Sequence, residues 1–356
     1  MRRTLRRRRP LSRRFQRRHP QLGEIVTTTL EGRPAGAATA LTAEATGARS
    51  LAKTRTAEFV LTLACPERPG IVRAVTTFLA DRGFDIVEHQ QFDDHVSGKL
   101  YLRTAFIGSG TESRDRAHRD FEGDGPDQRG EQTAEGLTAE FAPIAAEFGM
   151  DFAIHDGRPP RLLVMVSKFG HCLNDLIFRW RAGSLGAEIA VVVSNHEDLR
   201  AMAENAGLPF IHVPVTPGTK PEAEARLLDL VAEYDADLVV LARYMQVLSN
   251  GLCNELRGRA INIHHSFLPG FKGAKPYHQA YDRGVKLIGA TAHYVTADLD
   301  EGPIIEQEVF RVDHSLDPDA LVTVGRDAES QALSRAVKWH CQHRVLLNNT
   351  RTVVFR

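Results

Sequence analysis

The 356-residue sequence lacks any long uninterrupted apolar segment. No run approaches the roughly 20 apolar residues that a membrane-spanning helix requires, so we expect a soluble protein with no membrane association. Cysteine is also scarce, and no two of the four residues, Cys65, Cys172, Cys253 and Cys341, form a C-x-x-C pair. This scarcity argues against a disulfide framework and a cysteine-ligated zinc site, and it indicates a reducing, cytoplasmic compartment.

Acidic residues are missing from the first 22 positions, which carry ten arginines. The stretch that follows, to about Thr56, is rich in Ala, Thr and Gly and has no aromatic residue. Residues 1–56 are therefore predicted to form a basic, disordered extension that cannot bury a core. Three interpretations of the basic run stay open: a nucleic-acid-binding tail, an organelle transit peptide, or a translation start assigned too far upstream. We favour the last interpretation and expect no nucleic-acid partner.

The rest of the chain reads as two folded domains, which its length and its ordinary content of 42% hydrophobic and 25% charged residues allow. The first, over residues 57–156, has a strand, helix, strand, strand, helix, strand pattern, which predicts a ferredoxin-like βαββαβ domain. The expected strands are 58–64, 84–92, 99–107 and 150–155, with helices at 71–83 and 138–148. Residues from about 108 to 135 contain no Val, Ile, Leu or Met, and we predict a disordered surface insertion there.

After a linker at Gly157–Pro160, strands and helices alternate over residues 161–356. Nearly continuous apolar strands separated by helices predict an α/β, Rossmann-like domain with a mostly parallel sheet, which binds ligands at the carboxyl ends of its strands. Strands are expected at 161–167, 187–194, 209–215, 236–242 and 260–265, and helices from about 173, near 197–206, at 221–233 and at 244–256. Two antiparallel strands (286–295 and 303–312), a long helix (318–343) and a terminal hairpin (344–355) should follow.

The densest polar cluster begins at Asn262, near the end of the predicted strand 260–265. Strand alternation puts Asn262 and His264 on one face and His265 on the other. An amide can hydrogen-bond a developing oxyanion, and an imidazole can donate or accept a proton near neutral pH. The pair could equally serve only to satisfy backbone groups of the following loop.

A second cluster is the acidic loop Thr296–Pro303. Asp and Gly are common turn formers, so the loop by itself says little. If the carboxylate of Asp300 lay beside His264, however, it would favour the protonated imidazole and could orient an attacking water.

Three motifs, spaced along the second domain, resemble motifs of the proteins that share the formyltransferase fold. In chain order they are Asn262–His264 followed by Ser266, Leu268 and Pro269, then His293–Thr296, and then Leu299–Pro303. The resemblance implies that Asn262, His264 and Asp300 form the catalytic set.

From Glu58 onward the chain is similar to the formyltetrahydrofolate deformylase family. The matching segments are Glu67–Val72, Ser167–Leu176, Ala242–Gln246, Asn262–Gln279 and Gly289–Gln307. The resemblance implies hydrolysis of the linear amide of 10-formyltetrahydrofolate, which would feed formate to purine biosynthesis and balance the one-carbon folate pools. It also implies that folate is the substrate, with neither a further cofactor nor a metal.

The same resemblance implies the other functional residues. The substrate-binding residues are expected to be Arg243, Met245, Gln246, Val247, His293, Thr296 and Gly302. The first domain is expected to be an ACT regulatory domain whose turn Arg68, Pro69 and Gly70 binds a small amino acid such as glycine or methionine. An ACT domain also implies a homo-oligomer.

Water is the expected acceptor of the formyl group. In related transferases, a glycine-rich turn after the first strand cradles the phosphate of the acceptor, whereas here Phe169 and His171 crowd that turn. The expected mechanism is addition of water to the formyl carbon, with Asn262 and protonated His264 stabilising the oxyanion and Asp300 orienting or deprotonating the water. Three alternatives remain: a formyl transferase, a metallohydrolase that uses the two adjacent histidines with Asp300, and a purely regulatory ACT protein.

Overall fold

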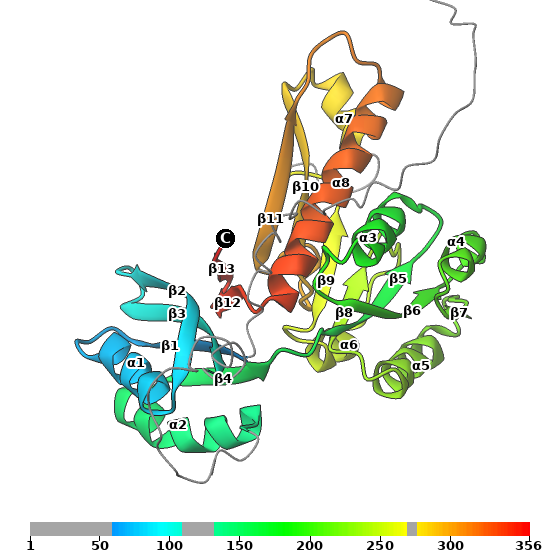
Figure 1. Ribbon diagram of the computed structural model, residues 1–356. Coiled ribbons are helices and arrows are strands. Elements are labelled where there is room, and N and C mark those ends of the chain that lie inside the picture. Colours follow the sequence, from blue (N-terminus) through cyan, green and yellow to red (C-terminus); the bar gives the residue numbers. More distant parts are fainter. Residues whose placement is uncertain (1–58, 109–131, 269–275) are drawn as a thin grey trace, which may run out of the picture. The chain divides into compact units, whose positions relative to one another are not determined.

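The computed structural model describes residues 59–108, 132–268 and 276–356, which form two large sheets and a terminal hairpin (Figure 1). The predicted extension 1–56, most of the predicted insertion and the segment 269–275 lie outside these residues. Among the described helices, none is both long enough and apolar enough to cross a membrane.

The first sheet has four antiparallel strands in the order β2-β3-β1-β4. Its elements are β1 (Phe59–Pro66), α1 (Ile71–Asp81), β2 (Phe84–Asp94), β3 (Lys99–Gly108), α2 (Ala134–Phe148) and β4 (Asp151–Asp156). This arrangement confirms the predicted ferredoxin-like order. The helices pack on the sheet through a core that includes Leu61, Phe106 and Phe141.

Helix α2 begins four residues before the predicted start. Thr133 caps it, since the Thr133 hydroxyl accepts the backbone N–H of Gly136 at 3.1 Å. Residues 134 and 135 therefore belong to this helix, with Thr133 as its cap, and not to the predicted insertion.

The second sheet has seven strands in the order β11-β10-β9-β8-β5-β6-β7. Five neighbouring strands, β5 to β9, run parallel, and β10 and β11 are antiparallel, which confirms the mostly parallel Rossmann-like sheet. Its strands are β5 (Arg161–Val166), β6 (Glu188–Ser194), β7 (Phe210–His212), β8 (Leu238–Leu241), β9 (Ala260–His264), β10 (Leu287–Tyr294) and β11 (Ile304–Arg311). Its helices are α3 (His171–Arg181), α4 (Arg200–Asn205), α5 (Lys220–Glu233), α6 (Asn250–Glu255), α7 (Pro276–Asp282) and α8 (Pro318–Cys341). The hairpin of β12 (Val345–Asn348) and β13 (Arg351–Val354) ends the chain as predicted.

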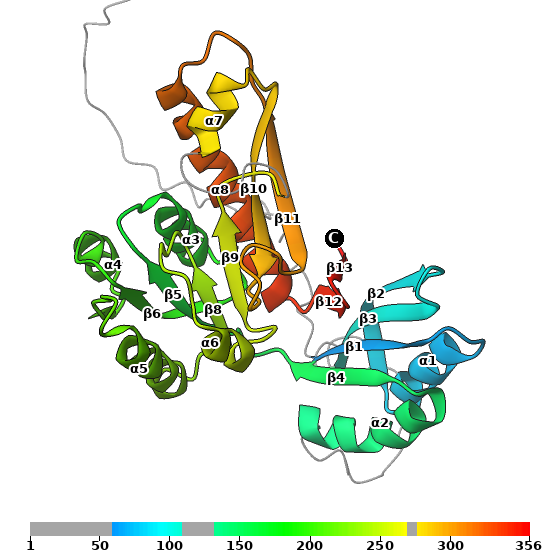
Figure 2. The same ribbon diagram turned by 180° about the vertical axis from the view of Figure 1, so that it is seen from behind.

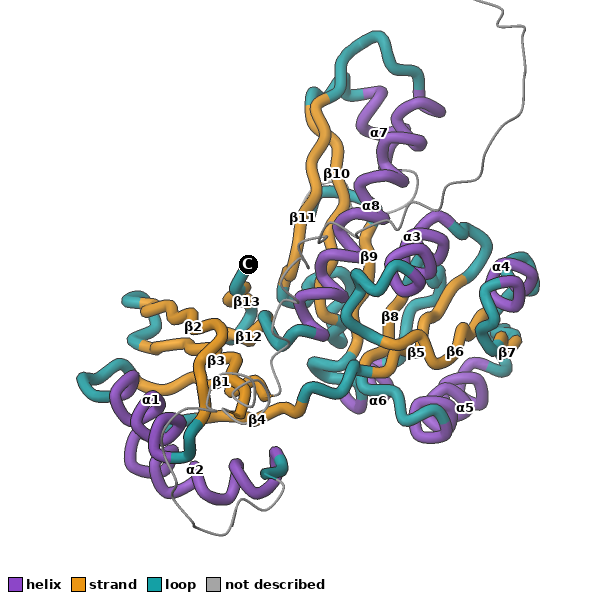
Figure 3. Tube along the Cα trace, viewed as in Figure 1, coloured by secondary structure: helices purple, strands orange, loops and turns teal. Residues whose placement is uncertain are grey.

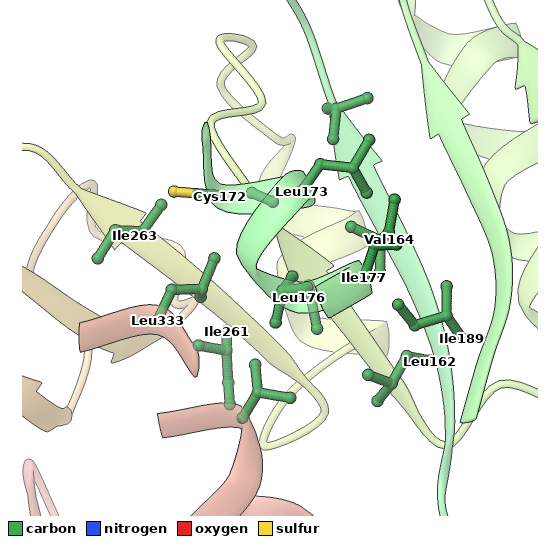
Figure 4. Close-up of a cluster of buried hydrophobic side chains, with 14 of the residues drawn as sticks. Leu162, Val164, Cys172, Leu173, Leu176, Ile177, Ile189, Ile261, Ile263 and Leu333 are labelled. Carbon is green, nitrogen blue, oxygen red and sulfur yellow. The ribbon is translucent and has the colours of Figure 1, made fainter. Parts of the chain in front are cut away.

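Both faces of the parallel sheet are covered (Figures 1 and 2). Leu162 and Val164 of β5 pack toward α3 and α8, while Leu163 and Met165 pack toward α5 and α6. Figure 4 shows one of these two cores, where α3 meets the strands β5 and β9 and Leu333 of α8. Double coverage explains why the sequence of these strands is nearly continuously apolar.

The predicted helix 244–256 is wrong in its first half, because α6 begins only at Asn250. Arg243 has a left-handed backbone with φ of 66°, and the N–H of Met245 donates to the hydroxyl of Ser167 at 3.0 Å. Ser249 then caps α6 by accepting the N–H of Leu252 at 3.2 Å. The residues 243–249 are thus a loop at the carboxyl end of β8.

The antiparallel pair β10 and β11 runs beside α8, and β10 also pairs with β9 (Figure 3). In that register His293 lies opposite Asn262, and Thr291 lies opposite His264. The sheet therefore brings residues from two distant motifs side by side.

Candidate active site

A cavity of about 320 Å³ opens at the carboxyl ends of β8 and β9. This is the position where α/β sheets generally bind ligands. Its lining includes all but one of the predicted catalytic and substrate-binding residues: Arg243, Met245, Gln246, Val247, Asn262, His264, His293, Thr296 and Asp300. The exception is Gly302.

His264 and Asp300 are joined by a hydrogen bond within this cavity. The Nδ1 atom of His264 lies 3.2 Å from Oδ1 of Asp300, and both side chains are largely buried. The hydrogen bond from His264, which outweighs burial, lowers the pKa of Asp300 below its usual range. Asp300 is therefore ionised at neutral pH, as a base or a water-orienting group must be.

The other ring nitrogen of His264, Nε2, is buried and has no hydrogen-bond partner among the described residues. An unpaired buried polar atom costs free energy, so native proteins rarely retain one without a functional reason. With Nδ1 directed at Asp300, the Nε2 atom is available to a bound ligand.

His293 holds the amide of Asn262. Its Nδ1 lies 2.9 Å from the carbonyl oxygen of Tyr294 and must donate to it, so its Nε2 accepts the hydrogen bond from Nδ2 of Asn262 at 3.3 Å. Burial lowers the pKa of His293, which favours this neutral form. His293 also lies 3.9 Å from Asp300, so it touches both groups.

Gly302 shapes the loop that carries Asp300 instead of contacting the cavity. A Cβ atom at this position would lie 1.7 Å from the carbonyl oxygen of Tyr294, so no other residue fits. The N–H of Tyr294 in turn donates to the carbonyl of Pro303 at 3.0 Å. The close approach fixes the path of the chain two residues after Asp300.

Ser167 is a positioning residue that the sequence analysis missed. Its buried hydroxyl donates to Oδ1 of Asn195 at 2.6 Å and accepts the N–H of Met245 at 3.0 Å. It thereby ties the loop 243–249 to the end of β5. A serine directly after an apolar parallel strand was the available clue.

A second charged cluster lies next to the cavity and also went unrecognised. The buried carboxylate of Glu329, on α8, accepts hydrogen bonds from His171 at 2.7 Å and from the hydroxyl of Tyr277 at 2.8 Å. The guanidinium of Arg243 lies 3.2 Å from the same carboxylate. A lone acidic residue in a long helix resembles a solvent-facing position, so the sequence alone gave no reason to select it.

His171, Cys172 and Glu329 offer ligand atoms within 4.8 Å of one another, which raises the question of a metal site. The carboxylate, however, is already paired with the cationic Arg243. Burial also raises the pKa of Cys172 well above its usual value, which keeps the thiol protonated. A protonated thiol beside an arginine does not fit a cation site.

The predicted regulatory turn lies on the first sheet domain. Gly70 has φ of 99° and precedes the first residue of α1, a conformation that suits glycine. The guanidinium of Arg68 lies 4.1 Å from the ring centre of Phe148 and donates to the carbonyl of Glu147 at 3.2 Å. The turn is thus held against the end of α2.

Phe169, which was expected to crowd an acceptor site, is 44% exposed in the turn after β5. Its ring lies 5.6 Å from the guanidinium groups of both Arg243 and Arg326. His171 points into the cluster around Glu329. Both bulky side chains therefore occupy the turn.

Comparisons with known proteins show which family this chain is similar to. A formyl transferase family model matches residues 160–337. A formyltetrahydrofolate deformylase of Corynebacterium sp. (strain P-1) is 53% identical over 298 residues, which cover 83% of this chain and 98% of the relative.

Solved structures extend the match to both sheets. A formyltetrahydrofolate deformylase from Burkholderia mallei is 51% identical, with a TM-score of 0.75 over 84% of this chain and all of the other. Glycinamide ribonucleotide transformylase 1 from Symbiobacterium toebii is 30% identical, with a TM-score of 0.52 over 56% of this chain and 95% of the other.

Proposed function

The chain belongs to the formyltetrahydrofolate deformylase family and hydrolyses its formyl-folate substrate, and we propose that it does so in the cavity beside Asn262, His264 and Asp300. The observation that carries this proposal is the buried, unpartnered Nε2 of His264, next to an ionised carboxylate and an oriented amide. These are the three groups that hydrolysis of an amide needs: an oxyanion donor, an acid and a base.

The reaction begins with water that hydrogen-bonds to Asp300. The contacts of Asp300 with His264 and with the neutral His293 both involve Oδ1, so Oδ2 can accept the hydrogen bond from the water. The water oxygen attacks the formyl carbon and its proton passes to Asp300. The carbonyl oxygen becomes an oxyanion, which the amide of Asn262 and the Nε2–H of His264 stabilise.

Collapse of the tetrahedral intermediate breaks the bond between the formyl carbon and N10. A proton, delivered by His264 or through a relayed water, goes to N10, and the products are formate and tetrahydrofolate. The remaining lining residues, from the loop 243–248 and the loop 295–300, would hold the pterin ring. The amide of Asn262 is oriented before the substrate binds, because one of its two N–H groups donates a hydrogen bond to His293.

Water serves as the acceptor in this proposal, and an amine does not. The experiment is to measure formate released from 10-formyltetrahydrofolate by the full chain, with no amine present and with a chelator added. Formate and tetrahydrofolate in equal amounts are the expected result. Turnover that appears only after an amine is supplied would identify a transferase, and loss of activity in chelator would favour the metallohydrolase.

The released formate would feed purine biosynthesis and balance the folate pools from the cytoplasm. This role is supported by the family to which the chain belongs. Fractionation of cells that express the full chain is expected to recover deformylase activity in the cytoplasmic fraction, and recovery in an organelle would contradict it.

We further propose that the first sheet domain is an ACT regulatory domain of a homo-oligomer, with a small amino acid bound at the turn Arg68–Gly70. The ferredoxin-like order of that sheet supports this proposal. Glycine or methionine should change the rate of formate release or the melting temperature, and Gly70→Val should abolish the response. A chain that sediments as a monomer and ignores both amino acids would overturn it.

A further inference from the structure

The buried cluster around Glu329 takes no part in the hydrolysis proposed above, although side chains from several elements of the fold converge on it. The Glu329 side chain is 1% exposed, and its partners come from three separate elements: His171 of α3 and Tyr277 of α7 donate hydrogen bonds, and Arg243 of the loop after β8 forms an ion pair. Burial opposes the charge of Glu329, but the hydrogen bond from His171 and the charge of Arg243 lower its pKa overall. The cluster therefore holds a true carboxylate inside the protein.

The contact between Tyr277 and helix α8 requires a glycine at position 325. Gly325 lies one turn before Glu329 on α8, and a Cβ atom there would lie 2.1 Å from Cζ of Tyr277. The missing side chain lets the ring of Tyr277 lie against the helix. Its hydroxyl can then reach the carboxylate of Glu329.

Arg243 connects this cluster to the cavity. It is a lining residue, and its left-handed φ of 66° is unfavourable for any residue other than glycine. The Nε atom of Arg243 lies 3.2 Å from the carboxylate of Glu329. Since the next four residues, 244–247, also line the cavity, the position of Arg243 sets the start of this wall.

The location of the carboxylate is the second informative feature. His171 is the first residue of α3, at the carboxyl end of the first parallel strand β5. Helix N-termini at this edge of an α/β sheet are where external anions such as phosphate generally bind. Here the chain places its own anion beside the first residue of that helix and neutralises it with its own arginine.

We propose that Glu329 is an internal anion that determines acceptor specificity: it occupies Arg243, the cationic group that an anionic acceptor would need, and it positions Arg243 at the cavity wall. The inference rests on the proposed function, because it explains why water and not a phosphorylated amine takes the formyl group. Glu329 acts through Arg243 and His171 and is a positioning residue.

The test uses inorganic phosphate as the probe on the full chain, at constant ionic strength set with KCl. We compare the wild type, Glu329→Gln and the double variant Glu329→Gln with Arg243→Gly. The wild type should show no phosphate-specific change in melting temperature. Glu329→Gln should melt lower in KCl and gain a saturable rise in melting temperature with phosphate, together with inhibition of formate release by phosphate.

The double variant should lose the phosphate response, because the freed cation is then gone and glycine accepts the left-handed backbone. A Glu329→Gln protein as indifferent to phosphate as the wild type would overturn the proposal. So would a double variant that still responds, since the phosphate would then bind elsewhere. The melting measurement needs no turnover, so it stands even if the wild type proves to require an amine and the proposed function fails.

Gly325→Ala supplies a second test if Glu329→Gln does not fold. The added methyl should displace Tyr277, loosen Glu329 and Arg243, and raise KM for the folate several-fold while kcat changes little. Gly251→Ala is the matched control, because this helical glycine of α6 has only an ordinary contact of 3.8 Å with Ser249. A Gly325→Ala protein that loses stability with KM unchanged would show a merely structural cluster and overturn the positioning role.

Discussion

Two charged clusters border the cavity, and they differ in whether the central side chain of each has partners for its polar atoms. In the first, Nε2 of His264 is buried without a partner among the described residues. In the second, the carboxylate of Glu329 accepts hydrogen bonds from His171 and Tyr277, and Nε of Arg243 lies 3.2 Å from it without forming a hydrogen bond. Groups that act on a substrate must stay available, whereas groups that position others gain from full pairing. We therefore expect the first cluster to act on the substrate and the second to position the wall of the cavity.

The largest effect is expected when the two proposed oxyanion donors of the first cluster, His264 and Asn262, are removed. His264→Ala and Asn262→Ala should each lower kcat for formate release by roughly 10²–10³, the usual cost of losing one oxyanion donor. Their melting temperatures should change far less than their rates. His314→Ala, at an exposed position, is the control and should retain the wild-type rate. If either active-site variant kept most of its activity, the first cluster would not be the catalytic one.

Gly302 tests whether the first cluster depends on the backbone path as well as on side chains. Gly302→Ala should displace the loop around Asp300 and lower kcat by about 10², since a 1 Å misplacement of a reacting group costs this much. Gly218→Ala is matched to it, because a Cβ atom at Gly218 meets nothing within 4 Å. Equal activity in the two variants would mean that the loop tolerates the contact with Tyr294.

The pH dependence of stability sharpens the description of the second cluster. Glu329 faces His171, Arg243, Tyr277 and the thiol of Cys172, and its folded pKa lies below the ordinary value of 4.5. A carboxylate with a lowered folded pKa stabilises the protein above its unfolded pKa, and this stability is lost as the pH falls through the folded value.

Glu329→Gln should therefore unfold more easily than the wild type at pH 7, by about 1.5–3 kcal/mol, the typical value for a hydrogen bond to a charged group. The difference should shrink below pH 4.5. Urea unfolding of both proteins at pH 7 and at pH 4 measures it. A difference that is constant with pH would mean that Glu329 is not ionised in the folded protein.

Ser167 should give the smallest effect. Ser167→Ala removes the hydroxyl that joins Met245 to Asn195, so the loop 243–249 should loosen, and KM should rise several-fold with kcat nearly unchanged. The exposed Ser315→Ala is the control. Steady-state kinetics of the two variants measure kcat and KM. A loss confined to kcat would show that Ser167 acts in the hydrolysis step and does not position the loop 243–249.

The sequence by itself determined the two folds, whereas the catalytic assignment of Asn262, His264 and Asp300 came from a family resemblance and stays a prediction. Periodicity of two and of 3.6 residues marks strands and helices directly, so the βαββαβ order and the parallel sheet were both predicted correctly. Strand alternation places Asn262 and His264 on one face, and the resemblance to the formyltransferase fold then selects them, together with Asp300, as the candidate catalytic residues.

Only the tertiary structure decided the pairings between distant segments. The irregular loop 243–249 was predicted as helix, because its breaks come from Ser167 and from the left-handed Arg243, neither of which leaves a periodic trace. Glu329 lies 158 residues from His171 along the chain. The role of Glu329 depends on which side chains the folded sheet and helices place around it. Those side chains come from segments far apart in the sequence, so no local sequence pattern predicts the cluster.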